Sequence, residues 1–385
     1  MADIFDYVEK YRDIMFGDEE LNEIDNAIFC RLAYLDFSGF SGKTLGEIAE
    51  KYTPANTENR QIKETERLLE LTGSTKRFGY TSLCAVNEII SEDSANAFYG
   101  ETFALDKDTY FIAFRGTDDK FVSYYEDAEL AYAFPIASQT TAFNYVSYEL
   151  KNRDGEFYIG GHSKGGNLAL FSYIFLSDAE KSRIVKVFNN DGPGFPEEMA
   201  EILFTPFNNR KILSILPEDS IVGRMLDLGG EISIIKSTAS GAAQHNIFTW
   251  ETQDNSFVCT GQFSLLSEYV EDTLTDSLKT INPEHIKRVA QMILGISQGS
   301  GIRSTNEIDA KSFIRILISL RQIYKENESS DEDIQIIIKT LIKSLFGAIN
   351  LEKIINRSMP VFTQQIEAFT EKFGKEENKE NASEN

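Results

Sequence analysis

Residues 158–168 read Tyr-Ile-Gly-Gly-His-Ser-Lys-Gly-Gly-Asn-Leu. This stretch contains Gly161-x-Ser163-x-Gly165, with an apolar, strand-like segment before it and an apolar, helix-like segment after it. A strand that turns sharply into a helix around a serine is the arrangement of a nucleophile elbow. Backbones pass close together in such a turn, so the positions flanking Ser163 need small residues. The pattern therefore predicts that Ser163 projects from a strand end as a nucleophile.

Two other interpretations compete with the elbow. One is a plain glycine turn between a strand and a helix. The other is a phosphate-binding loop, but the Gly-x-x-x-x-Gly-Lys-Ser/Thr spacing is absent. The strand before the turn, the helix after it and His162 within it favour the elbow.

Outward from the elbow, strand patterns alternate with helix patterns. This alternation predicts an α/β protein with a mostly parallel sheet covered by helices on both faces. Segments 96–104 and 109–114 are rich in aromatic and β-branched residues and predict a hairpin. The other predicted strands are 157–160, 185–188, 211–216 and 232–235, and the predicted helices are 22–35, 138–152, 165–176 and 196–204.

The 385 residues suggest two domains, or one large domain with an appendage. We predict a domain over residues 1–262 that includes N-terminal helices. Residues 263–374 show no convincing strand, and their apolar stripes predict a helical extension that packs on the domain. Residues 375–385 form a short polar tail that we expect to be disordered.

The composition narrows the classes of partner. The net charge of −23 argues against nucleic acid, because such a chain repels phosphate backbones. An anionic membrane surface would repel it too, although an apolar patch leaves contact with a lipid surface open. The acidic start and the absence of an apolar run of about 18 residues predict a cytoplasmic protein. Three scattered cysteines predict neither a disulfide framework nor a thiolate zinc site. Oligomeric state is left open.

A serine nucleophile needs a base, and the chain offers only His162, His245 and His285. His162 is adjacent to Ser163 and should point elsewhere, while His285 follows what resembles an exposed helix start. His245 lies in a loop of small residues downstream of the elbow, as the chain order Ser…Asp…His requires. We therefore predict that His245 is the base.

The acid must orient His245 and stabilise its imidazolium. Asp191 follows the first predicted strand beyond the elbow, and Glu218 and Asp219 follow the second. In this kind of fold the acid usually follows the second strand, so we favour Asp219. Asp191 and Glu218 remain alternatives.

Two backbone N–H groups are predicted to stabilise the oxyanion. Lys164 supplies one, because its N–H follows the nucleophile at the start of a helix. Thr117 supplies the other, from the loop after the strand 109–114, where Gly116 permits a tight turn. We also predict that the Lys164 side chain makes an ion pair with an acidic residue at the rim of the pocket.

These residues resemble a known family. Phe114-Arg115-Gly116-Thr117 followed by Glu126-Asp127, and then residues 161–166, resemble the class 3 (fungal-type) lipase pattern of α/β-hydrolases. A bacterial branch of that superfamily is more similar still. The segments that match it are Asp25-Asn26, residues 31–37, residues 161–169 and Gln244-His245. The resemblance covers about residues 20–260, and it implies an α/β-hydrolase fold with a Ser163–Asp219–His245 triad and Thr117 and Lys164 as oxyanion donors.

The sequence thus predicts a serine hydrolase that cleaves an ester or thioester with an apolar acyl or alkyl part. The expected partner is a small ester or lipid-like molecule, and the mechanism calls for neither a metal nor an organic cofactor. One rival is a catalytically silent binding or scaffold protein with a hydrolase shape. Another is an amidase or peptidase, because nothing in the sequence excludes that leaving group.

Overall fold

The computed structural model describes residues 2–265, apart from 56 and 58, together with residues 267, 287, 288, 291 and 295. The chain divides into two units after residue 290, and the sheet and helices that follow belong to the first unit. The predicted helical extension, the predicted tail and His285 lie almost wholly outside the described residues, so the boundary at 262 stays a prediction.

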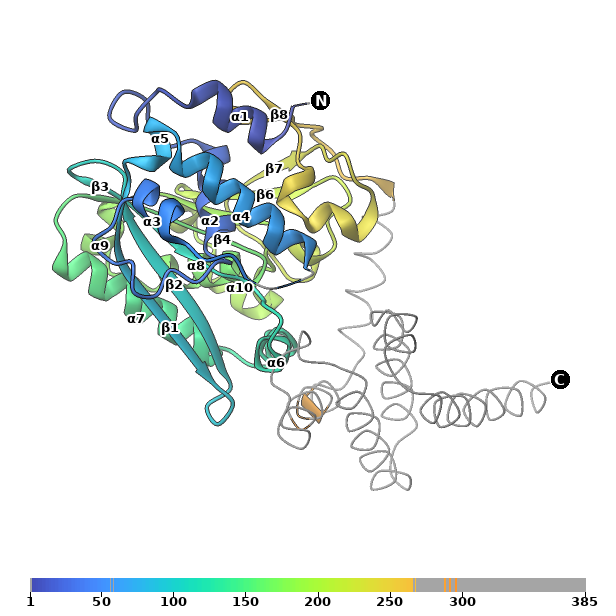
Figure 1. Ribbon diagram of the computed structural model, residues 1–385. Coiled ribbons are helices and arrows are strands. Elements are labelled where there is room, and N and C mark those ends of the chain that lie inside the picture. Colours follow the sequence, from blue (N-terminus) through green and yellow to red (C-terminus); the bar gives the residue numbers. More distant parts are fainter. Residues whose placement is uncertain are drawn as a thin grey trace, which may run out of the picture. The chain divides into compact units, whose positions relative to one another are not determined.

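A seven-stranded sheet organises the described part of the chain, and its strands lie in sequence order (Figure 1). The first three strands pair antiparallel, and β3 to β7 run parallel. The predicted hairpin is confirmed as β2 and β3, which are preceded by β1. The strands are β1 Ser82–Ser91, β2 Asn96–Ala104, β3 Thr109–Phe114, β4 Glu156–His162, β5 Ile184–Asn190, β6 Ile212–Pro217 and β7 Glu231–Ile235, with a separate pair β8 Thr252–Gln253 and β9 Ser256–Phe257.

Helices cover both faces of this sheet. Helix α2 packs on one face of the sheet, and α4 packs on the outer side of α2. Helices α7 and α8 pack on the other face (Figure 1). The helices are α1 Ile4–Tyr11, α2 Glu23–Leu32, α3 Leu45–Lys51, α4 Arg60–Gly73, α5 Lys76–Gly79, α6 Phe121–Glu129, α7 Ala137–Asn152, α8 Lys164–Ile174, α9 Asp178–Ser182, α10 Glu197–Leu203 and α11 Pro206–Asn209, with 3₁₀ turns η1 Val222–Arg224, η2 Gly241–His245 and η3 Ile247–Thr249. None of the helices described is long and apolar enough to cross a membrane.

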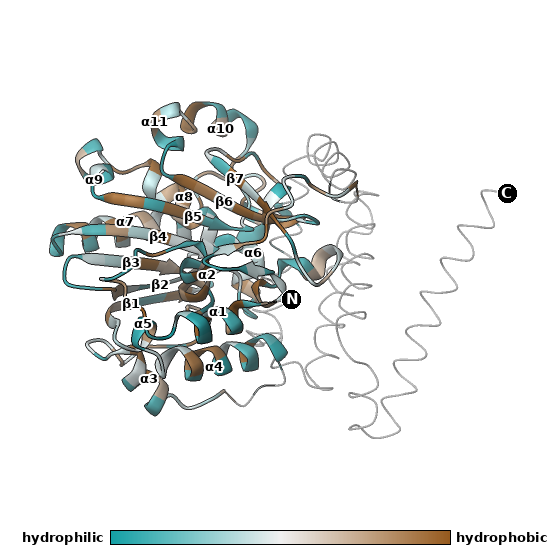
Figure 2. Cartoon of the chain, turned by 90° about the horizontal axis from the view of Figure 1, so that it is seen from above, coloured by the Kyte–Doolittle hydropathy of each residue, from teal (hydrophilic) through white to brown (hydrophobic). Residues whose placement is uncertain are grey.

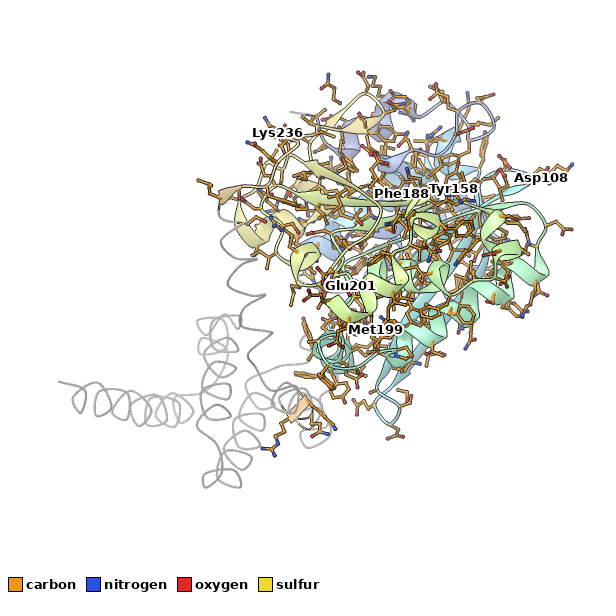
Figure 3. The ribbon with its side chains drawn as sticks, turned by 180° about the vertical axis from the view of Figure 1, so that it is seen from behind. Asp108, Tyr158, Phe188, Met199, Glu201 and Lys236 are labelled. Carbon is orange, nitrogen blue, oxygen red and sulfur yellow. The ribbon has the colours of Figure 1, made fainter. Side chains whose placement is uncertain are left out.

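Successive side chains of each strand point to opposite faces of the sheet, and they contribute to a separate hydrophobic core on each face. On β4, Phe157 and Ile159 join the core under α7 and α8, whereas Tyr158 joins the core under α2. The Tyr158 ring stacks on Phe188 of the neighbouring strand β5, with centroids 6.4 Å apart (Figure 3). The largely hydrophobic colouring of β5 and β6 fits strands buried on both sides, while α4 alternates between hydrophobic and hydrophilic residues (Figure 2).

A mostly parallel sheet between two helical layers, with a strand–serine–helix turn near its centre, is an α/β-hydrolase fold. The predicted fold class is therefore confirmed. The carboxyl ends of β4, β5 and β6 meet at one edge, so residues that follow these strands lie near one another. Helix α6 was not predicted, because its acidic residues interrupt the apolar pattern and no side chain caps its start at Lys120.

A buried carboxyl on β2 makes stability depend on pH. Glu101 is fully buried and accepts a hydrogen bond from the Tyr99 hydroxyl at 3.0 Å, while its Oε1 has no hydrogen-bond partner among the described residues. Burial raises the pKa of Glu101 from 4.5 to about 8, against the opposing effects of Tyr99 and Arg115. Between these values the folded state keeps a proton that the unfolded state has lost, so stability falls as the pH rises through this window.

We expect Glu101→Gln to be more stable than the wild type at pH 8, by about 2–4 kcal/mol. The glutamine keeps an oxygen for the Tyr99 hydroxyl but carries no charge at any pH. The difference in the free energy of unfolding should shrink toward zero as the pH falls to 4.5, as urea titrations at several pH values would measure. Parallel pH profiles for the two proteins would contradict this account.

Candidate active site

Ser163 occupies a strained turn between β4 and α8. Its backbone angles are φ 58° and ψ −133°, a conformation that side-chain-bearing residues rarely adopt. The Ser163 N–H donates to the Asn190 carbonyl of β5 at 3.0 Å, which fixes the turn to the neighbouring strand. Strain of this kind persists only where the surrounding structure imposes it, and a nucleophile elbow is such a place.

Glycines make room for the elbow, as the sequence predicted. A Cβ atom on Gly161 would clash with the carbonyl group of Gly165 across the turn. A Cβ atom on Gly116 would clash with the His162 carbonyl oxygen and come within 3.0 Å of Ser163 Cβ. The loop after β3 therefore passes directly against the serine, and only a glycine fits there.

His245 contacts a buried carboxylate at the end of β5. Its Nδ1 lies 2.7 Å from Asp191 Oδ2. Because that carboxylate accepts the bond, Nδ1 carries the proton and Nε2 is left free to act as a base. Asp191 Oδ1 also accepts hydrogen bonds from Ser220 Oγ at 2.5 Å and from the Gly223 N–H at 3.2 Å. Three donors thus hold this carboxylate in place.

The prediction that Asp219 contacts His245 is wrong. Asp219 instead accepts hydrogen bonds from the Gly241 N–H at 2.7 Å and from Gln244 Nε2 at 3.0 Å, and a third from Ser264 Oγ. It holds the backbone of the loop that carries His245 rather than the imidazole ring. Glu218 does not contact the ring either.

Strand register explains why Asp191 takes this place. His162 of β4 pairs with Asn190 of β5, so the residues after them, Ser163 and Asp191, lie level at the sheet edge. Asp219 lies two residues beyond the end of β6, farther from the elbow. Asp191 was kept as an alternative in the sequence analysis because it is the first Asp after the predicted strand 185–188, which in the structure extends to Asn190.

The buried His162 ring holds the backbone of the loop that carries His245 by a hydrogen bond. Its Nε2 lies 2.8 Å from the His245 carbonyl oxygen, which can only accept, so Nε2 donates and Nδ1 accepts from the Tyr34 hydroxyl at 3.0 Å. Burial holds the pKa of His162 well below its ordinary value, which keeps the ring neutral. The centroids of the His162 and His245 rings are 4.5 Å apart. As expected, His162 is not placed to be the base.

The Thr117 side chain is fixed by a carboxylate for which the sequence alone predicted no role. Thr117 Oγ1 lies 2.7 and 2.8 Å from the two oxygens of Asp127 on α6. Burial raises the pKa of Asp127, although Lys164 and the Thr117 hydrogen bond oppose the shift. This contact orients the loop whose N–H was predicted to face the oxyanion. The adjacent acidic residues Glu126 and Asp127 were the feature of the sequence that could have indicated this contact.

Lys164 makes the predicted ion pair, but in the interior rather than in an exposed rim. Its Nζ lies 2.7 Å from Glu126 Oε2 and donates to the Ala97 carbonyl at 3.2 Å. The side chain is only 1% exposed. Burial alone would lower the pKa of Lys164, but the carboxylates of Glu126, Asp127 and Asp118 together outweigh burial and raise that pKa. The pair ties α6 to the first residue of α8.

Breaking this pair should destabilise the protein strongly. We expect Lys164→Leu to lower the free energy of unfolding by about 3–5 kcal/mol, because it leaves the Glu126 charge buried without a cation. Lys164→Leu combined with Glu126→Gln should recover at least half of that loss. Lys43→Leu, which removes an exposed pair with Glu47, should change stability by less than about 1 kcal/mol. Urea denaturation measures all three, and equal losses for Lys164→Leu and Lys43→Leu would contradict the expectation.

A cavity of about 320 Å³ joins these groups. Ser163 and His245 both line this cavity, although no hydrogen bond between Ser163 Oγ and His245 Nε2 is formed among the described residues. Unliganded sites are often loose in this way. No group of three or more His, Cys, Asp and Glu within the described ranges could hold a metal ion. The cavity is lined by Arg31, Tyr34, Gln61, Thr117, Tyr124, Asp127, Leu130, Ala131, His162, Ser163, Lys164, Pro193, Val222, Met225, Leu226 and His245.

A family model places this chain among known proteins. The model described as Mbeg1-like matches residues 72–295, which is more than half of the chain and includes the elbow, Asp191 and His245. The chain belongs to the Mbeg1-like family. This family is lipase-like, in agreement with the resemblance found in the sequence, while the bacterial branch stays a prediction. No curated protein sequence matches the chain.

Solved structures that are similar to this family member include lipases and esterases. M37 lipase is 13% identical, with a TM-score of 0.36, over 82% of this chain and 98% of its own. The Rhizomucor miehei lipase in complex with its propeptide is 13% identical, with a TM-score of 0.34, over 56% of this chain and 68% of its own. An esterase from Pyrobaculum calidifontis is 10% identical, with a TM-score of 0.27, over 61% of this chain and 96% of its own.

Proposed function

We propose that this Mbeg1-like protein is a serine hydrolase that cleaves an ester or thioester with an apolar acyl or alkyl part. One observation carries the proposal. A strained Ser163 and a His245 whose Nδ1 binds the buried Asp191 line the same cavity. A plain structural turn gives no reason for this serine to be strained beside an oriented histidine.

In the proposed mechanism, Ser163 Oγ attacks the substrate carbonyl while His245 Nε2 takes the hydroxyl proton. Asp191 holds the His245 tautomer and stabilises the imidazolium that forms. The imidazolium then protonates the leaving group, and water, activated by His245 in the same way, hydrolyses the acyl-enzyme. The Thr117 and Lys164 N–H groups are the proposed oxyanion donors, each contributing about 3 kcal/mol to the transition state.

Apolar side chains support an apolar substrate part. Leu130 and Ala131 follow α6, and Val222, Met225 and Leu226 belong to η1 or to the segment after it; all five line the cavity. An acyl or alkyl chain that replaces water against these residues gains about 0.8 kcal/mol for each buried CH₂ group. Activity should therefore rise with chain length until the cavity is full.

A fluorophosphonate probe tests the proposal, because it reacts only with an activated serine. We expect it to label the purified protein at Ser163 and to abolish hydrolysis of p-nitrophenyl esters of graded chain length. An unlabelled protein with no esterase activity would instead support a silent binding or scaffold protein. Labelling combined with faster cleavage of matched p-nitroanilides than of esters would favour an amidase or peptidase.

A further inference from the structure

Within the described part of the chain, one buried cation lines the cavity without a carboxylate in contact. Arg31 lies in the last turn of α2 and is only 2% exposed, yet it reaches the cavity that holds Ser163 and His245. Helix α4 packs beside α2 and covers it (Figure 1). A guanidinium in such a position has lost most of its hydration, and this loss needs compensation.

The hydrogen bonds of Arg31 go to neutral groups, and Glu64, a carboxylate whose charge raises the pKa of Arg31, forms no ion pair with it among the described residues. Its Nε donates to Thr65 Oγ1 at 2.8 Å and its Nη2 donates to the Gln61 carbonyl at 3.1 Å. The guanidinium lies over the Tyr34 ring at 4.4 Å and 5.3 Å from the Phe248 ring centroid. Nη1 donates to no atom of the described residues. Several of the five N–H donors thus remain available.

Three other buried cations of the described chain pair with carboxylates. Arg77 lies 2.5 Å from Asp25, Arg115 lies 3.2 Å from Glu88, and Lys164 lies 2.7 Å from Glu126. Of these three, only Lys164 also lines the cavity, and its Nζ donates to Glu126 and to the Ala97 carbonyl. Burial lowers the pKa of Arg31 to about 10, so it still carries its charge at neutral pH.

We propose that Arg31 binds an anionic group of the substrate, a carboxylate or a phosphate, so that the hydrolase prefers acidic esters over neutral ones. The proposal rests on the proposed function and names the substrate class of the same site. A planar guanidinium with two adjacent free donors fits a pair of anionic oxygens. The Tyr34 ring fixes the guanidinium plane. Asp127 lines the same cavity, and burial raises its pKa although Lys164 opposes that shift.

Matched ester pairs test this preference. The wild type should cleave p-nitrophenyl hemiglutarate with a higher kcat/KM than p-nitrophenyl butyrate, whose acyl chain lacks the acid. A second pair, 1-acylglycerol 3-phosphate and 1-acylglycerol, tells a phosphate from a carboxylate. Assays belong at 0.15 M salt, where the net charge of −23 is screened beyond about 8 Å.

The variant Arg31→Gln should lower the anionic-to-neutral ratio of kcat/KM at least tenfold, and Arg31→Lys should lower it less, because a lysine offers a point charge. Arg67→Gln is the matched control: this exposed arginine on α4 lies over the Phe5 ring, away from the cavity, and should leave the ratio unchanged. An unchanged ratio in Arg31→Gln, or no preference in the wild type for either acidic ester, would overturn the proposal.

Binding separates this proposal from the proposed function. Calorimetry on Ser163→Ala, which cannot form an acyl-enzyme, should show that monobutyl glutarate binds more tightly than dibutyl glutarate. Adding Arg31→Gln or Arg31→Lys should remove or reduce that difference. An Arg31-dependent difference in a chain with no esterase activity would sustain the anion site and reject the hydrolase. Equal binding of the two glutarates would reject the anion site, whatever the esterase result.

Discussion

Ser163→Ala is expected to reduce kcat for p-nitrophenyl ester hydrolysis by about 10⁴- to 10⁶-fold. The substitution removes only the attacking oxygen and leaves the oxyanion donors and the cavity in place. Without Oγ no acyl-enzyme forms, so the residual rate reflects water attacking a bound ester. Single-turnover and steady-state rates measure the loss, and the thermal midpoint of the variant should stay near that of the wild type.

A serine on the same helix supplies the control. Ser172 is fully buried on α8, and its Oγ donates to the Leu168 carbonyl at 2.7 Å, within the helix. Ser172→Ala should therefore keep full activity per folded molecule. If Ser163→Ala kept more than about a tenth of the wild-type rate, the proposed nucleophile would be wrong, because triad serines contribute several orders of magnitude.

Asp191→Asn is expected to give the second large loss, about 10⁴-fold in kcat, with the cavity intact. An amide in this place can donate to Nδ1, which favours the tautomer whose proton sits on Nε2. In that tautomer His245 cannot accept the Ser163 proton. The loss should shrink at high pH, where hydroxide replaces the general base.

Asp219→Asn separates the two candidate acids. Asp219 binds the backbone and Gln244 side chain of the His245 loop, so its loss should loosen that loop. We expect kcat to fall less than tenfold and the thermal midpoint to drop by several degrees. A larger loss of kcat for Asp219→Asn than for Asp191→Asn would reverse the assignment drawn from the geometry.

The nucleophile elbow could be predicted because it depends on residues that are adjacent in the sequence. Gly161, Ser163 and Gly165 lie within five residues, and the turn they form is a local consequence of backbone crowding. The alternation of strands and helices around the elbow could also be predicted, because a strand that is buried on both faces of the sheet appears in the sequence as a continuous apolar run. Chain order and elimination selected His245 from three histidines.

The choice between Asp191 and Asp219 was not local. Both follow strands that end at the same sheet edge, but Asp191 follows β5, next to β4, whereas Asp219 follows β6 and lies one residue farther beyond its strand. The pairing of His162 with Asn190 decides it, because this register sets Asp191 level with Ser163. A sequence carries strand periodicity but does not state which residues of two strands lie side by side.

The remaining features of the site depend on burial between segments that are far apart in the sequence. The elbow, the α/β class and the acidic character of the Lys164 partner could be predicted from the sequence. The identity of that partner, Glu126, and the burial of the pair depend on how α6 packs against α8, which local sequence does not reveal. The same holds for Arg31, whose charge is plain in the sequence. That its described hydrogen bonds go to neutral groups appears only when α2, α4 and the cavity are assembled, because solvation and pairing depend on neighbours distant in the chain.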